Sequence, residues 1–249
     1  MEGEFGKVKK KSGKWRAFWS GLVYKEVGGY YDNGLKQGLW SEFIKNYSRK
    51  AQICENGYYL NDQKQGKWNY IYKNNIIGWG LYNQLAEKQG KWIELSDGFS
   101  NYSQVTYNGE YQNGKKAGRW DILFRDQRQY RFQQIGGGLY NAGVKVGMWI
   151  ELSDGFQIYS KVTFQGIYKN GNKVGKWDIK IYKFDGKSNC SGGFYKEVEG
   201  CYTKMGKWIE QGYGLNLYSQ VILEGEYKNG RKLVNWIFCI IRNKEMFRN

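Results

Sequence analysis

The chain of 249 residues contains no histidine and no proline. Histidine is the side chain that most often transfers protons near neutral pH. Its absence excludes Ser-His-Asp and Cys-His catalytic arrangements and every histidine-containing metal site. Proline cannot donate a backbone hydrogen bond, so a chain without it keeps all of its backbone donors for a continuous sheet. The missing histidine argues against an enzyme, and we expect neither a cofactor nor a bound metal ion.

Cysteines and long apolar runs are also scarce. The four cysteines, Cys54, Cys190, Cys201 and Cys239, form no Cys-x-x-Cys pair, which disfavours a zinc cluster. No run of about 18 apolar residues exists, so we expect no membrane-spanning helix. The start of the chain, Met1–Glu4 followed by a basic stretch, does not resemble a signal peptide. These absences predict a cytoplasmic protein with reduced thiols.

The chain is rich instead in aromatic residues, glycine and positive charge. It has 11 Trp, 22 Tyr, 12 Phe and 35 Gly, and 41% of its residues are hydrophobic, which is enough apolar material for a folded core. The formal net charge of +16 favours anionic partners such as phospholipid headgroups, acidic proteins or nucleic acid. Lysines that serve only as solvated turn residues are the alternative explanation.

A Gly-x-Trp step recurs along the chain, with 24 to 31 residues between successive tryptophans. Nine of the 11 tryptophans belong to this step; eight of the nine follow a glycine by two positions, and the last follows Val234 and Asn235. Recurrence at a nearly fixed period indicates a repeat architecture. The signature residues are Trp15, Trp40, Trp68, Trp92, Trp120, Trp149, Trp177, Trp208 and Trp236.

The clearest copies, 109–120 and 166–177, read G-x-Y-x-N-G-x-K-x-G-x-W. Tyrosine and tryptophan favour strands, and Asn-Gly tolerates the positive φ that reverses a chain in a tight turn. Each copy therefore predicts one β-hairpin. The glycine two residues before Trp either resets the strand twist or lets neighbouring backbones approach closely. Glycine clusters such as Gly28-Gly29 and Gly136–Gly138 predict bulges, with close approach to a ligand as the alternative.

The predicted fold class is all-β: an elongated, twisted antiparallel sheet or solenoid of about nine stacked hairpins. We expect the tryptophans to form a column in which neighbouring units cover one another. The predicted domain organisation is a single array over 1–249, with an irregular N-terminal unit or cap at 1–25 and a terminal unit and cap at 226–249. The apolar closing strand Ile237–Ile241 is either a covered last strand or the seam of a homodimer.

The position two residues after each tryptophan shows that the true period is a double unit. It holds Glu42, Glu94, Glu151 and Glu210 in alternate copies and an apolar residue in the others. Glu94 with Asp97 could be read as a catalytic carboxylate pair. A cross-strand ion pair with lysine, followed by an Asp-Gly turn, is the favoured interpretation.

These motifs resemble the MORN-repeat family in a variant abundant in ciliated protists, and the likeness extends from Gly3 to about Ile241. The first two units and Asn235 depart from the pattern. The resemblance implies a scaffold or a cortical, ciliary or membrane-peripheral adaptor that binds other proteins. It also implies anionic phospholipid and a second copy of the chain as candidate partners. The family supplies no catalytic residues to carry over.

The basic residues of the hairpin turns are the predicted contacts to an anionic partner, because stacking would align them along one edge. They are Lys115, Lys116, Arg119, Lys173, Lys176, Arg231 and Lys232. The alternative function is a binding module for an anionic polymer, nucleic acid or a glycan through a basic and aromatic face. Nucleic acid is disfavoured, since the same aromatic residues are needed for the core. Buried aromatic side chains would weaken this alternative, and a solvent-open aromatic ladder would favour it.

Overall fold

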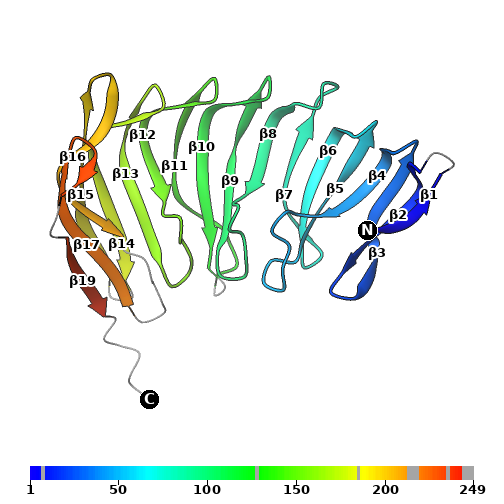
Figure 1. Cartoon of the computed structure of the whole chain (residues 1–249), viewed down its shortest axis with the longest axis horizontal. Helices are drawn as coiled ribbons and strands as arrows, with labels where there is room; N and C mark the ends of the chain where they lie inside the picture. Colours follow the sequence, from blue (N-terminus) through cyan, green and yellow to red (C-terminus); the bar gives the residue numbers. More distant parts are fainter. Residues whose placement is uncertain (7–8, 127–128, 184–185, 212–218, 234–235, 243–249) are drawn as a thin grey trace, which may run out of the picture. The chain divides into compact units, whose positions relative to one another are not determined.

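A computed structural model describes residues 1–6, 9–126, 129–183, 186–211, 219–233 and 236–242 (Figure 1). The chain divides into two compact units, Met1–Ala117 and Gly118–Asn249, which are described separately. All regular elements among the described residues are β-strands, and paired strands run antiparallel. The predicted all-β fold of stacked hairpins is therefore confirmed. In the same part of the chain, no helix is long and apolar enough to cross a membrane.

In the first unit each strand pairs with the next one along the chain, so spatial order follows sequence order. Short turns and loops suffice for such a meander. The strands are β1 (Glu2–Phe5), β2 (Lys11–Trp19), β3 (Leu22–Asp32), β4 (Leu35–Phe43), β5 (Ile53–Leu60), β6 (Gln63–Tyr72), β7 (Asn75–Tyr82), β8 (Lys88–Leu95) and β9 (Gln104–Gln112).

The second unit repeats the same meander, which begins with β10 (Lys115–Arg125), a strand that lies mostly within it. Consecutive strands pair, and both β18 and β19 pair with β17. The following strands are β11 (Gln133–Asn141), β12 (Val144–Leu152), β13 (Lys161–Lys169), β14 (Asn172–Lys183), β15 (Gly186–Val198), β16 (Cys201–Gln211), β17 (Ser219–Lys228), β18 (Arg231–Lys232) and β19 (Ile237–Arg242).

The two ends of the array differ in how much of them is described. At the first copy, β1 pairs with β2, and a Cβ on Gly3 would lie 2.5 Å from the ring of Trp15. The first strand thus covers the first tryptophan as later strands cover theirs. At the other end β19 pairs with β17, but the side chains that follow Ile237 lie outside the described residues, so the homodimer seam stays a prediction.

The Asn-Gly turns reverse the chain as predicted. At Asn113 and Gly114 both central residues have positive φ, 48° and 71°, and Asn170 and Gly171 repeat the pair at 48° and 80°. Two consecutive positive φ values define the turn whose twist matches that of the flanking strands. Glycine tolerates this conformation because it has no Cβ, and asparagine because its short polar side chain can form local hydrogen bonds there.

The two glycines of the motif have different roles. Gly66, two residues before Trp68, has a φ of +61°, and a Cβ there would meet nothing within 4 Å. A Cβ on Gly57, two residues before Tyr59, would instead lie 2.3 Å from the ring of Trp68. Close approach therefore belongs to the first glycine. Of the two roles predicted for the glycine before tryptophan, the positive φ fits a change of strand twist, and no close approach is found at Gly66. Register shifts also adjoin the clusters at Gly28 and Gly137, which confirms the predicted bulges.

The tryptophans form the predicted columns, in which they alternate with tyrosines. From Trp15 to Trp208 the signature tryptophans are 1–5% exposed. Within each unit, tryptophan and tyrosine rings from neighbouring strands meet edge to face at centroid distances of 4.9–6.3 Å. Edge-to-face pairs add roughly 0.5–1.5 kcal/mol each to the gain from burial. The aromatic column is therefore the principal core of each unit.

A second apolar cluster fills the part of each sheet beyond the column. In the second unit, Ile122 and Phe124 are buried at alternate positions after Trp120, as the period-two pattern predicts. The Ser-Asp-Gly-Phe loops contribute to these clusters, since Phe156 meets Phe124 at 5.2 Å and Phe99 is fully buried. The loops are thus part of the core as well as connections between strands.

Candidate functional site

A polar cluster covers the aromatic column at each glutamate-bearing copy. In the first unit Glu94 accepts a hydrogen bond from the hydroxyl of Tyr111 at 2.8 Å and forms ion pairs with Lys88 and Lys116, the latter at 2.8 Å. These side chains come from the three consecutive strands β8, β9 and β10. The ion pairs confirm the interpretation of Glu94 as a cross-strand partner of lysine.

The cluster recurs in the second unit with the same geometry. Glu151 binds Lys145, Lys173 at 2.9 Å and the Tyr168 hydroxyl at 2.8 Å. Another copy is centred on Glu210, with Lys204, Lys232 at 2.8 Å and Tyr227 at 2.9 Å. Because three glutamate-bearing copies build the same arrangement, it belongs to the repeat and is not a singular site.

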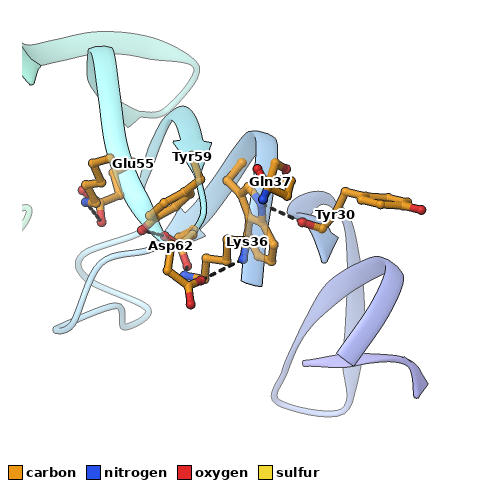
Figure 2. A network of polar contacts seen from close by, with 9 residues as sticks. Tyr30, Lys36, Gln37, Glu55, Tyr59 and Asp62 are labelled. Atoms are coloured by element: carbon orange, nitrogen blue, oxygen red, sulfur yellow. Dashed lines mark hydrogen bonds and ion pairs between the residues drawn. The ribbon is translucent and has the colours of Figure 1, made fainter. Parts of the chain in front are cut away.

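In the first glutamate-bearing copy, around Glu42, the two lysines pair with two different carboxylates. Glu42 binds Lys36 and the Tyr59 hydroxyl, while Lys64 pairs with Glu55 at 2.7 Å. Figure 2 shows this network, in which the backbone N–H of Lys36 also donates to the Asp62 carboxylate at 2.7 Å. A second acidic residue therefore takes the place of the second carboxylate oxygen used in later copies.

The same lysines lie over the aromatic rings. The Nζ atom of Lys64 is 4.0 Å from the ring centroid of Trp68, and that of Lys173 is 4.1 Å from the centroid of Trp177. Cation–π contacts of this length contribute roughly 0.5–1 kcal/mol at exposed sites. Each such lysine therefore shields the column and neutralises a carboxylate, and its charge is balanced within the fold.

The protonation states of the cluster do not suit acid–base chemistry near neutral pH. Burial alone would raise the pKa of Glu94, but the ammonium groups of Lys88 and Lys116 hold it below its ordinary value. Burial, with the nearby carboxylates Glu55 and Glu94, raises the pKa of Tyr82 to about 12. An ionised, fully paired carboxylate is a poor general base, and a tyrosine of such a high pKa is a poor acid at pH 7.

The structure separates the seven predicted anion contacts into three sets. Lys116, Lys173 and Lys232 lie on the tryptophan face, paired with glutamates. Arg119 and Lys176 lie on the opposite face, where they pair with Asp121 at 2.7 Å and Asp178 at 3.1 Å. Lys115 and Arg231 are exposed at the first positions of β10 and β18, directly after turns, and have no ion pair among the described residues. The seven residues do not form one row, and their contact with an anionic partner stays a prediction.

The sequence reasoning missed a set of exposed apolar side chains on the face opposite the tryptophans. Each one immediately precedes a tryptophan or tyrosine of the column. Because successive side chains of a strand point to opposite faces, this position in the sequence could have predicted their exposure. The set comprises Tyr30, Leu39, Tyr58, Leu81, Leu139, Met148, Ile167 and Phe194.

The comparisons with known proteins do not identify the repeat. No family model matches the chain, and no curated protein matches it. The resemblance to the MORN family therefore rests on the repeat motif alone and stays a prediction. Within the described residues, no cluster of three or more acidic or cysteine side chains is placed to hold a metal ion.

Proposed function

We propose that the chain is a non-enzymatic, MORN-type repeat scaffold that binds other proteins in the cytoplasm, in a cortical, ciliary or membrane-peripheral setting. The observation that carries the proposal is the repetition of the polar cluster. The carboxylates Glu94, Glu151 and Glu210 have equivalent lysine and tyrosine partners. A catalytic site requires one singular constellation, whereas a scaffold uses equivalent modules to extend its surface.

The burial of the aromatic columns disfavours the alternative function. Nucleic-acid and glycan recognition by stacking needs exposed ring faces. The signature tryptophans from Trp15 to Trp208 are instead buried against tyrosines of adjacent strands. A partner protein that contacts the outer surface of the sheet requires no opening of this core.

Cross-linking of the intact chain in its source cell, followed by mass spectrometry, tests the scaffold function. We expect cross-links from surface lysines to a small set of proteins, in amounts that exceed those from a denatured sample of the same chain. Recovery of nucleic acid or glycan in place of protein, or equal recovery with the denatured control, would contradict the proposal.

A separate assay tests the membrane-peripheral part of the proposal, which rests on the exposed turn residues Lys115 and Arg231. We expect sedimentation with vesicles of phosphatidylcholine and phosphatidylserine that declines with added salt, because exposed charges are screened. The double variant Lys115→Glu, Arg231→Glu should sediment less. Equal sedimentation with phosphatidylcholine alone, or none with either vesicle, would remove the membrane from the proposal.

A further inference from the structure

Adjacent residues of the same strand have opposite environments in this sheet. Trp40 is 2% exposed, whereas Leu39 before it is 80% exposed. Leu39 is a large apolar residue that contributes little burial to the fold, and its exposure to water is unfavourable. A single exposed leucine is ordinary, but a contiguous set of such residues marks an interaction surface.

Leu39 belongs to a contiguous set in the first unit. Tyr30 on β3 and Tyr58 on β5 lie on either side of it and are 54% and 46% exposed. Leu39 is directly opposite Tyr58, whereas Tyr30 is opposite Gln37, two residues along β4 and next to a register shift. Figure 2 shows the ring of Tyr30 pointing away from the polar network around Lys36 and Tyr59. We call Tyr30, Leu39 and Tyr58 the first triplet.

Basic residues border the first triplet on both sides. Lys14 on β2 is directly opposite Tyr30, and Lys67 on β6 occupies the position before its own tryptophan, as Leu39 does. Neither lysine has an ion pair among the described residues. The first triplet is therefore an apolar strip with a positive charge at each end.

The second unit carries the same order of side chains. Leu139, Met148 and Ile167, the second triplet, are 46–55% exposed on the consecutive strands β11, β12 and β13. Met148 is directly opposite Ile167, and Arg119 is directly opposite Leu139. Lys176 on β14 occupies the place of Lys67. Both units thus present a cation, three apolar residues and a second cation in the same order.

The correspondence continues past the triplets. Lys67 faces Leu81 and Lys91 faces Glu110 in the first unit. In the second unit Lys176 faces Phe194 and Lys207 faces Glu226. Since charged residues fill these equivalent positions, the fold does not require apolar residues there. The triplets are consequently a property of the surface that is repeated once in each unit.

We propose that each triplet is a docking site for an amphipathic helix of a partner protein, so that one chain binds two such helices. This inference rests on the proposed scaffold function and specifies its partner. Neighbouring strands are ~4.8 Å apart, close to the ~5.4 Å rise of one helical turn. A helix laid across the strands would therefore place apolar residues at i, i+4 and i+7 over the three members of a triplet.

The flanking cations define the ends of the partner segment. Lys14 and Lys67 lie four strand spacings apart, which is ~19 Å or about 13 residues of helix. Acidic residues one turn beyond each end of the apolar stripe would meet these lysines. The partner is thus an acidic, amphipathic helix of about four turns.

The charges around the second triplet favour a protein over an anionic membrane. Asp121 and Asp178 lie on the same face, paired with Arg119 and Lys176. Because each cation at this triplet is paired with a carboxylate, little net positive charge remains there to attract a bilayer of acidic lipid. A helix can exchange with such exposed ion pairs, because they contribute little stability. We therefore expect weaker, less salt-sensitive binding at the second triplet than at the first.

Selection from a displayed library of helical peptides, randomised on one face, tests the proposal on the intact chain. We expect an enriched pattern of three apolar residues one turn apart, with acidic residues beyond them. The selected peptide, synthesised and titrated by calorimetry, should bind at two sites per chain. Leu39→Glu and Met148→Glu should each weaken one site by more than about tenfold, and together they should abolish binding.

A matched control is Ile76→Glu, which adds the same charge at an exposed apolar residue outside the triplets. It should leave both sites intact, and circular dichroism should show that all variants fold. No enrichment, or binding that survives the double triplet variant, would overturn the proposal. A third result would also overturn it: the parent chain binds no peptide, and the double variant loses binding to phosphatidylserine vesicles. The triplets would then contact lipid and not a helix. If proteins cross-linked in cells remain bound to the double variant, the scaffold function stands and this inference falls.

Discussion

The two faces of the same strands differ in how closely their residues repeat from copy to copy. On one face the aromatic column and its lysine–glutamate clusters recur from copy to copy, as at Trp92 with Glu94 and Trp149 with Glu151. On the other face the position before tryptophan holds leucine, methionine, lysine, arginine or asparagine. Because only the first face is repeated closely, it specifies the fold. The second face is free to vary, which is where recognition can be encoded.

The largest expected effect comes from removal of a column residue. Trp92→Ala deletes a fully buried ring that contacts Tyr82 and Tyr111 on the adjacent strands. Comparable core truncations cost about 3–5 kcal/mol, since burial is lost and a cavity remains. Urea unfolding followed by circular dichroism measures the change. If Trp92→Ala loses no more stability than Lys91→Ala on the opposite face, the contrast between the faces is wrong.

The two glycines of the motif allow a finer test of the tryptophan face. Gly57→Ala drives a Cβ to 2.3 Å from the ring of Trp68, so the indole must move, at a cost of about 1–3 kcal/mol for overpacking. Gly66→Ala has open space but keeps a positive φ, which costs about 1 kcal/mol. Thermal unfolding of both variants separates them. A larger loss at Gly66 would mean that backbone strain outweighs the contact with the ring.

Substitution of a cluster carboxylate has a smaller effect. Glu94→Gln leaves Lys88 and Lys116 without a counter-charge, and solvent reaches both ammonium groups, so we expect a loss of about 1 kcal/mol. Unfolding at pH 7 measures this loss. The substitution Glu26→Gln, at an exposed glutamate on the opposite face that has no ion pair among the described residues, is the matched control and should change stability less.

The pH dependence of the same variant gives a second readout. The pKa of Glu94 is lowered in the folded state, so its contribution is complete above the ordinary value near 4.5 and is lost as pH falls through the lowered one. The parent chain should therefore lose more stability than Glu94→Gln between pH 5 and about pH 3. Equal acid sensitivity of the two proteins would show that the ion pairs contribute nothing.

The structure of the repeated tryptophan face could be predicted from the sequence, whereas the exposed apolar triplets of the opposite face could not. The spacing of Trp and Asn-Gly predicts hairpins, because turn chemistry and strand periodicity are local. The partner of Glu94 could also be predicted, since lysine lies at a fixed offset in the motif. The role of Gly57 could not, because it depends on a ring from the next strand. The triplets were missed because their members are 9 to 28 residues apart and become neighbours only through register.

The smallest expected effect on stability lies at the triplets, and it completes the contrast between the faces. Leu39→Ser removes an apolar side chain that is mostly in water, so the free energy of unfolding should change by less than about 0.5 kcal/mol. In the double variant Leu39→Ser, Met148→Ser the two small changes in the free energy of unfolding should add, because the two residues lie in different units. Urea unfolding of the single and double variants checks both statements. A loss near that of Trp92→Ala would mean that Leu39 is a packing residue, and its exposure could then no longer be interpreted as a surface kept for a partner.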